Sequence, residues 1–499
     1  MSINFKTIPF IGGLNTTAPS VTIPAGMLLD CMNYECLQEG GYQRIQGYQL
    51  CNGSDTPDAV PGVGPILGLH IYKDALYAVR DDVNGVGRLY KTTVTGWEEV
   101  DGAVTWTGGG RYEFANYNFF GQDEQEEMFI VNGKDKAKKY DGTAFVDLTT
   151  GLTEDKPSSV IGFKFHLVLG IESSLMISSV GDPTNWDAAT GSASEIAVGD
   201  TITTLEVSQG ALIIGCRKGT QILYGNDASD FRLEPTNKTG TYRHTMQNVG
   251  GQIIGIDDAG VMSLQASNAF GNFVYASISD AIRNQMRTLI DQGDLRTAVN
   301  RAKGQYRVFS GRNGLIFSFT GQQLLGITKL YFDHPVRSIT NGDIAGEERS
   351  FFGDDEGNVY QLDTSYTFNG EKIYSHMLTA FHHYGLPTQQ KRFRQISFDM
   401  RVQGERPTIY VLPITDFGGG FSTDAINTTN FEGMRTGGGL WDFSLWDELV
   451  WDELYGYMGK VRVNSVGSNM GIMISSDGSE GNHVIYAATV HYSPRRLKR

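Results

Sequence analysis

The sequence predicts an all-β protein built around a β-propeller, and two observations indicate this fold. The 499 residues include 62 Gly, 23 Tyr and 26 Phe. This composition favours many short strands joined by tight turns, because Gly adopts the positive φ of hairpin turns and aromatic side chains suit pleated surfaces. One unit also recurs along the chain: an apolar run of alternating polarity, a short turn rich in Gly, Asp or Asn, and a second alternating run. Such a repeat is typical of propeller blades.

The repeat has two clear copies and five looser ones. In the clear copies, residues 252–256 lead through the turn 257–260 into 261–264, and residues 350–353 lead through the turn 354–357 into 359–362. The looser copies pair 75–79 with 87–90, 127–131 with 138–140, 166–170 with 175–177, 211–215 with 220–224, and 305–309 with 314–317. The turns fall near residues 84, 133, 172, 217, 258, 312 and 355, and a four-stranded blade occupies about 40 to 50 residues. We therefore expect a six- or seven-bladed β-propeller over residues 61–370, with a pair of β-sandwiches as the alternative.

Different patterns flank this repeat. After about residue 370, six runs of alternating polarity follow, at 372–381, 394–402, 408–412, 460–466, 471–475 and 483–492. They predict a separate antiparallel β-domain over residues 371–499. Residues 1–60 show no periodic pattern and are expected to form a partly ordered N-terminal arm. A short helix is predicted from Ser279, as its start, to Ile290, inserted after the fifth blade.

Charge and composition narrow the classes of function. The net charge of −15 argues against a nucleic-acid clamp, which needs clustered Lys and Arg, but is compatible with a channel through which DNA slides. No apolar run is long enough to span a bilayer and the N-terminus lacks a secretion-signal pattern, so we expect a soluble protein made in the cytoplasm. The four cysteines, Cys31, Cys36, Cys51 and Cys216, are expected to be reduced and mostly buried.

The sequence contains no recognisable catalytic constellation. The acidic groups Asp257-Asp258 and Asp354-Asp355-Glu356 resemble the carboxylate pairs of glycosidases, but they fall in hairpin turns, where Asp and Gly are favoured for backbone reasons. Glycosidase carboxylates need raised and lowered pKa values in one pocket, and the sequence marks no such pocket. We therefore expect a protein that is not an enzyme and has no catalytic residue, metal or cofactor.

A block of tryptophans near the C-terminus is the most unusual local feature. Trp-Asp recurs every five residues, at Trp441, Trp446 and Trp451, and Tyr455 follows. This period fits neither a helix face nor a strand face. Two interpretations stay open: a loop that folds back on its own domain, or an anchor for a partner or a second copy, because Trp is enriched at interface centres.

The C-terminus is basic in an otherwise acidic chain. Arg495 and Arg496 lie in the segment Pro494-Arg495-Arg496-Leu497-Lys498-Arg499. This segment is either a solvated tail or a docking element for an acidic partner. With the aromatic residues of the Trp-Asp block, these two arginines are the candidate interface residues.

Several short segments together carry a resemblance to a known family. They are Gly12-Gly13-Leu14-Asn15-Thr16-Thr17-Ala18-Pro19, Met32-Asn33-Tyr34, Gly41-Tyr42-Gln43-Arg44 with Gly47-Tyr48, Lys218-Gly219-Thr220-Gln221-Ile222-Leu223-Tyr224, and the Trp-Asp block. With the repeat, they make the chain similar to the packaged-DNA stabilisation or tail-nozzle (tail-hub) proteins of short-tailed bacteriophages, the podoviruses. The resemblance covers most of the chain.

The resemblance implies a structural virion protein of the tail, synthesised in the host cytoplasm. It implies a homo-oligomeric ring, usually a hexamer, below the portal and the head-to-tail adaptor. Such a ring conducts DNA through its lumen at ejection, helps to retain the packaged genome and supports tail fibres or spikes, without membrane insertion. An acidic wall suits a conduit, because weak repulsion lets a polyanion pass. The alternative is a phage propeller that binds or hydrolyses glycans, which needs an axial pocket lined by acids or aromatics.

Overall fold

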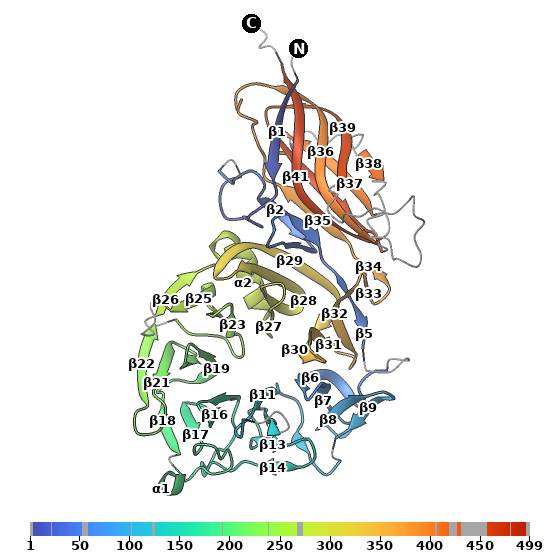
Figure 1. The fold of residues 1–499 in the computed structure, drawn as a ribbon. Coiled ribbons are helices and arrows are strands. Elements are labelled where there is room, and N and C mark those ends of the chain that lie inside the picture. The colour runs from blue at the N-terminus through green and yellow to red at the C-terminus, as the bar shows by residue number, and fades with distance from the viewer. Residues whose placement is uncertain are drawn as a thin grey trace. The chain divides into compact units, whose positions relative to one another are not determined.

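The computed structural model describes residues 3–20, 22–51, 58–100, 102–121, 125–191, 193–237, 239–266, 273–404, 407–418, 427–430, 457–479 and 481–495. Strands dominate it (Figure 1). The chain divides into two compact units. The β-domain comprises Met1–Gln49, Gly314–Asp333 and Leu362–Arg499, and the propeller comprises Leu50–Asn313 and His334–Gln361.

Within the described residues, the propeller has seven antiparallel blades. Blade 1 contains β6 (Val63–Tyr72), β7 (Ala75–Asp81), β8 (Val86–Thr93), β9 (Gly96–Glu99) and β10 (Trp106–Thr107). Blade 2 contains β11 (Glu113–Tyr117), β12 (Glu127–Val131), β13 (Lys138–Tyr140) and β14 (Phe145–Asp147). Blade 3 contains β15 (Ser159–Phe163), β16 (His166–Ile171), β17 (Ser174–Ile177) and β18 (Ser194–Ala197), with the short helix α1 (Ala188–Gly191) before β18.

The remaining blades follow in chain order. Blade 4 contains β19 (Ile202–Ser208), β20 (Ala211–Cys216), β21 (Thr220–Tyr224) and β22 (Arg232–Asn237). Blade 5 contains β23 (Gln247–Val249), β24 (Gln252–Asp257), β25 (Gly260–Ala266) and β26 (Phe273–Ser277). Blade 6 contains β27 (Arg296–Asn300) and parts of β28 (Gln305–Thr320) and β29 (Gln323–Val336), and blade 7 contains β30 (Ser338–Ile344), β31 (Glu347–Gly353) and β32 (Val359–Ser365). The predicted all-β fold with a propeller is confirmed.

Each blade buries both of its faces against its neighbours, which explains the continuous apolar runs in the sequence. In β12, Met128 and Ile130 pack with residues of blade 1, whereas Phe129 and Val131 pack with residues of blade 3. Successive side chains of a strand point to opposite faces, so a strand buried on both faces is apolar throughout. The hydrophobic core of the propeller therefore lies between the blades.

The ring of blades closes on itself. The innermost strands β6, β11, β15, β19, β23, β27 and β30 contact one another in this order, and β30 contacts β6. The segment before blade 1 returns to blade 7, where the Cys51 N–H donates to the Val359 carbonyl and the Val60 N–H donates to the Gly357 carbonyl, each at 2.8 Å. Phe351 and Val359 of blade 7 share a buried cluster with Ile66 and Leu76 of blade 1.

A recurring glycine permits this close approach of blades. The first run of several repeat copies ends in Gly, as in Leu169-Gly170 and Phe352-Gly353. A Cβ atom on Gly170 would lie 2.9 Å from the side chain of Ile202 in the next blade, and one on Gly353 would lie 2.5 Å from Ile66 in blade 1. A larger residue at Gly353 therefore pushes apart the two blades that close the ring.

We predict that Gly353→Ala destabilises the propeller by about 1–3 kcal/mol, because overpacking a well-packed core forces its neighbours to move. Urea unfolding of the full chain, followed by near-UV circular dichroism, measures the effect. Gly102→Ala is the matched control, since a Cβ there meets only the Glu99 side chain, at 3.7 Å. Equal stability of the two variants would contradict the closure argument.

The hairpin expected at residues 305–317 is wrong. These residues form one continuous strand, β28, which pairs with β27 on one side and β29 on the other. Gly311 has φ +58°, so the Gly-Arg-Asn-Gly sequence that suggested a turn accommodates an irregularity within the strand. β28 and β29 each have residues in both units, because the unit boundaries fall after Asn313 and after Asp333.

The predicted helix after blade 5 is confirmed as a 3-10 turn, η2 (Asp280–Ile282), followed by α2 (Arg283–Gln292). Its buried residues include Ile282, Met286 and Leu289. Ser279 does not cap the helix with its side chain. Its hydroxyl oxygen instead accepts a hydrogen bond from the Val261 N–H at 2.9 Å.

The β-domain contains two antiparallel sheets. One has β1 (Asn4–Pro9), β3 (Tyr34–Cys36), β4 (Tyr42–Arg44), β36 (Lys391–Gly404), β39 (Tyr457–Gly467) and β41 (Gly481–Pro494). The other has β2 (Leu28–Met32), β35 (Ser375–Thr379), β37 (Thr408–Thr415), β38 (Asn427–Asn430) and β40 (Met470–Ser476). The 3-10 turn η3 (Asp416–Gly418) follows β37. The short strands β5 (Gly47–Leu50), β33 (Thr367–Phe368) and β34 (Glu371–Lys372) continue the sheet of blade 7 in the order β30-β31-β32-β5-β33-β34, with β5 and β33 parallel. All six strands predicted after residue 370 are present.

The N-terminal segment differs from the arm expected over residues 1–60. β1 pairs with β41 from Asn4 opposite Tyr492 to Pro9 opposite Ala487, and β2 pairs with β35. These partners lie hundreds of residues away in the sequence, so local periodicity does not reveal them. Residues 3–49 are thus strands and connections of the β-domain, and residues 58–60 already belong to the propeller.

Candidate functional site

Three cavities follow one another between the innermost strands of the propeller. The central cavity, of about 310 Å³, is lined by residues of β6, β11, β19, β23, β27 and β30. A cavity of about 810 Å³ shares Arg111, His244 and Arg296 with it. Another, of about 860 Å³, shares His70 and Asn341 with it. The shared lining residues show that each of these two cavities adjoins the central one.

A layer of charged side chains lies between the central cavity and the 810 Å³ cavity. Glu113 Oε1 lies 2.9 Å from His244 Nδ1 and 3.2 Å from Arg111 Nε. Arg111 Nη1 donates to the Leu295 carbonyl at 2.9 Å, and Arg296 Nη2 lies 2.7 Å from Asp294 Oδ1. Blades 2 and 6 and the segment before β23 meet in this layer, which separates the central cavity from the 810 Å³ cavity.

Electrostatics fixes the protonation states in the layer. Burial opposes the ionisation of Glu113, but His244, Arg111 and Arg296 outweigh it and lower its pKa to about 2. Burial lowers the pKa of His244, and the Glu113 carboxylate offsets this only in part. Burial and the nearby Arg111 lower the pKa of Arg296 to about 10, so it stays charged at neutral pH. The layer therefore holds an ionised Glu113, two guanidinium groups and a neutral imidazole that donates from Nδ1.

The side chains at the boundary between the central cavity and the 860 Å³ cavity are neutral. His70 Nε2 lies 2.7 Å from Asn116 Oδ1, and the His70 ring stacks on Phe114 with 5.0 Å between ring centroids. Burial lowers the pKa of His70 to about 4, so the ring is uncharged at neutral pH. Asn116 is held in turn by the Ile71 carbonyl, to which its Nδ2 donates at 2.9 Å.

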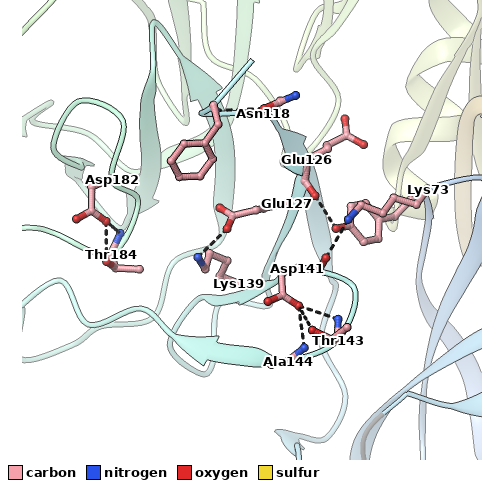
Figure 2. A network of polar contacts seen from close by, with 12 residues as sticks. Lys73, Asn118, Glu126, Glu127, Lys139, Asp141, Thr143, Ala144, Asp182 and Thr184 are labelled. Carbon is pink, nitrogen blue, oxygen red and sulfur yellow. Dashed lines mark hydrogen bonds and ion pairs between the residues drawn. The ribbon is translucent and has the colours of Figure 1, made fainter. Parts of the chain in front are cut away.

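The two end cavities carry opposite charge. The basic mouth is the 810 Å³ cavity, lined by Arg111, Lys134, Arg217, Arg243 and Arg296 with one carboxylate, Asp294. The acidic mouth is the 860 Å³ cavity, whose charged lining residues are Asp74, Glu126, Asp343 and Lys73. The single lysine of the acidic mouth is already engaged, since Lys73 Nζ donates to the Asp141 carbonyl at 2.9 Å (Figure 2). Figure 2 also shows the neighbouring ion pair between Lys139 and Glu127, at 2.7 Å.

Two carboxyl groups whose pKa values are shifted in opposite directions line the central cavity. Glu206 of β19 makes no ion pair within the described residues, and burial raises its pKa to about 7. Glu113 lines the same cavity with its pKa held near 2. The sequence marks no pocket of this kind. These residues come from blades 4 and 2, and only the closed ring places them on one cavity.

We predict that Glu206→Gln stabilises the protein by about 1–3 kcal/mol near pH 8 and has little effect near pH 4. The folded-state pKa lies above the unfolded value, so the native state favours the protonated acid, and stability is lost as pH rises through about 7. The amide stays neutral and removes this loss. Thermal unfolding against pH measures it, with Glu98→Gln as an exposed control. A pH-independent difference between Glu206→Gln and wild type would contradict the assignment.

The acidic turns identified in the sequence have structural roles, as predicted. Asp257 Oδ1 accepts hydrogen bonds from the Ala259 and Gly260 N–H groups at 2.8 and 2.9 Å. Asp354 Oδ1 accepts from the Glu356 and Asn358 N–H groups at 2.9 and 2.8 Å. Both side chains are buried and satisfy the backbone of their own turns.

Most of the predicted interface residues lie outside the described residues: Trp441, Trp446, Trp451, Tyr455 and Arg496. Arg495 is described. Its N–H donates to the Gln390 carbonyl at 2.8 Å, and its carbonyl accepts from Gln389 Nε2 at 2.6 Å. The main chain at Arg495 is thus fixed beside the end of β41, while its role at an interface stays a prediction.

The cysteines, possible metal-binding groups and possible membrane-spanning helices were also of interest in the sequence. The four cysteines are free thiols, and Cys31, Cys36 and Cys216 are buried, which raises the pKa of Cys31 and Cys216 to about 12. In the part of the chain that the structure describes, no three His, Cys, Asp or Glu side chains are grouped so as to hold a metal ion. Over the same residues, no helix is both long and apolar enough to cross a bilayer.

The N-terminal segments that carry the family resemblance meet in the β-domain. Gly13 has φ +66°, and a Cβ there would lie 2.4 Å from the Ile327 nitrogen, so only Gly fits. Its N–H donates to the Tyr42 hydroxyl at 3.0 Å, and that hydroxyl donates to the Gly26 carbonyl at 2.9 Å. Arg44, fully buried, donates from Nη1 to the Gly481 carbonyl at 2.6 Å and from Nη2 to the carbonyls of Tyr366, at 3.0 Å, and Gly478.

The fold and the axial site define a seven-bladed β-propeller protein with an additional antiparallel β-domain. No protein-family model matches the chain, and no curated protein matches it. Among solved structures, the chain is similar to the crystal structure of BBS1N in complex with ARL6DN, soaked with lead. That comparison has 12% sequence identity and a TM-score of 0.39, and it covers 64% of this chain and 98% of that chain. The blade assignment rests on the strand pairing described above.

Proposed function

We propose that the chain is a structural virion protein of a short-tailed bacteriophage, which forms an oligomeric tail-nozzle ring below the portal and adaptor. In this role it conducts and retains packaged DNA and supports tail fibres or spikes. The observation that carries the proposal is the convergence of the resembling segments. Gly13 bonds to Tyr42 in β4, and Arg44 of the same strand bonds to residues 478 and 481, which are far away in the sequence.

This convergence supports the resemblance because it gives the matching residues a shared physical cause. Short Gly-rich segments recur by chance, but Gly13 and Arg44 each meet a specific requirement of the fold. Gly13 needs positive φ and room for the Ile327 backbone. A buried Arg44 satisfies three main-chain carbonyls with one planar guanidinium.

The layer of charged side chains across the propeller axis limits where DNA would pass in the proposed ring. The Arg111–Glu113–His244 layer joins blade 2 to the segment before blade 5 across the space between the blades, so a duplex does not thread through a single propeller. A DNA lumen in the proposed ring therefore lies between copies of the chain. The net charge of −15 favours a conduit that does not retain DNA by adhesion.

We predict that the purified protein forms a symmetric ring, either alone or on a portal–adaptor complex. Negative-stain electron microscopy with rotational classification, together with analytical ultracentrifugation, measures this. A protein that stays monomeric at working concentration and does not assemble on the portal–adaptor complex would contradict the proposal.

The same measurement tests the predicted interface residues. If the Trp-Asp block anchors a neighbouring copy, Trp446→Ala reduces the ring fraction, because truncating a buried interface aromatic costs roughly 2 kcal/mol or more. Trp97→Ala, at a half-buried position of blade 1, is the control and leaves assembly unchanged. An intact ring with Trp446→Ala would count against the anchor but not against the ring.

A specific observation favours the glycan alternative as a second candidate. Glu206 and Glu113, with pKa values of about 7 and 2, line one axial cavity, and such a separation is what an acid and a carboxylate partner in glycoside hydrolysis need. Glu113, however, is already paired with Arg111 and His244, which also explains its pKa as a structural ion pair. Because Glu113 is held in these ion pairs, we prefer the tail-ring proposal to the glycan alternative.

The glycan candidate predicts release of reducing sugar from host surface polysaccharide, with Glu206→Gln lowering the rate at least about 100-fold, the usual loss on removing a general acid. Glu98→Gln is the control, with an unchanged rate. Sugar release that disappears only in Glu206→Gln would establish the alternative, whereas no release by the wild-type protein would remove it.

A further inference from the structure

The basic mouth concentrates positive charge in an acidic chain. Five basic side chains and one carboxylate line it, although the whole chain has 41 Lys and Arg against 56 Asp and Glu. The acidic mouth has the opposite balance. The fold therefore gathers basic side chains at one end of the axis and acidic side chains at the other. The excess of basic side chains at the basic mouth does not follow from the composition of the chain.

Two side chains of the basic mouth retain hydrogen-bond donors that the described protein does not use. Arg296 Nε is buried and has no hydrogen-bond partner, even though Arg296 Nη2 pairs with Asp294. Arg243 is exposed and makes no hydrogen bond or ion pair among the described residues. A buried donor without a partner destabilises the folded protein, and an oxygen ligand that reaches it removes this cost.

The other basic groups are held in place around the same cavity. Lys134 Nζ donates to the Gly108 carbonyl at 2.6 Å. The Arg217 guanidinium lies 5.2 Å from the centre of the Tyr242 ring and 3.6 Å from Asp258 Oδ1. Ser158 and Thr201 add hydroxyl groups to the lining. A cavity of about 810 Å³ falls within the usual range for small-molecule sites.

We propose that the basic mouth binds a terminal phosphate or diphosphate group. Guanidinium groups pair with phosphate oxygens through two parallel N–H bonds, and a phosphate monoester carries the double charge that several cations around one cavity favour. The Arg111–Glu113–His244 layer closes the inner end, so a ligand enters only from the mouth and end first. A terminal phosphate meets this condition, and an internal phosphodiester does not. The inference does not depend on the tail-nozzle proposal.

Calorimetric titration of the full chain with pyrophosphate tests the site. We expect binding that weakens as salt is raised, and a loss of affinity of about ten-fold or more in Lys134→Gln/Arg243→Gln, which removes two charges from the cavity. Both residues are exposed, so the fold is retained, and circular dichroism verifies this. Lys136→Gln is the matched control: Lys136 is exposed, lies two residues from Lys134 and bonds instead to Thr149.

The outcomes are distinguishable. Equal weakening by Lys136→Gln would show general surface attraction and overturn the proposal, as would no pyrophosphate binding in the millimolar range. A short thymidine oligonucleotide with a 5′-phosphate, compared with the same oligonucleotide ending in a 5′-hydroxyl, identifies the source of the phosphate. Tighter binding of the phosphorylated form points to nucleic-acid ends, and binding of pyrophosphate alone points to small phosphorylated molecules.

Discussion

The close approach of neighbouring blades is the constraint on which the rest of the propeller depends. Each blade buries alternate residues of the same strand against two different neighbours, as Met128 and Phe129 do, so no blade has a buried core by itself. The ring is stable only when blade 7 meets blade 1, where Gly353 leaves room for Ile66. The segment around Cys51 and Val60 adds backbone hydrogen bonds at the same junction. The first and the last segments of the propeller are thereby joined at the contact between blade 1 and blade 7.

Closure also creates the axial site. Seven innermost strands bring polar side chains from separate blades into a narrow space, and burial there shifts their titration: Glu206 upward, His70 and His244 downward. Glu113 stays ionised because Arg111 and His244 surround it. The resulting layer closes the axis and separates a basic mouth from an acidic one.

The β-domain depends on a different constraint, the pairing of segments that are distant in sequence. Its N-terminal strands complete sheets whose other strands follow residue 370, and the core around Gly13, Tyr42 and Arg44 links these segments. The propeller is thus inserted into the chain of the β-domain. An insertion of this kind leaves no boundary signal at residue 60, because strands before it find their partners only after the propeller has been completed.

The sequence by itself determined the all-β class, six of the seven expected hairpins, the turn roles of Asp257 and Asp354, and the six strands after residue 370. These features follow from local rules: alternation of polarity, turn chemistry and a period near the length of a blade. Tertiary structure alone decided the continuous strand at residues 305–320, the strands of the N-terminal segment and the axial site. Glu113 and Glu206 stand in different blades, Arg111 lies beside Glu113, and Arg243 and Arg296 follow Glu206 at long intervals in the chain. Their meeting is a consequence of ring closure, and no local pattern in the chain encodes it.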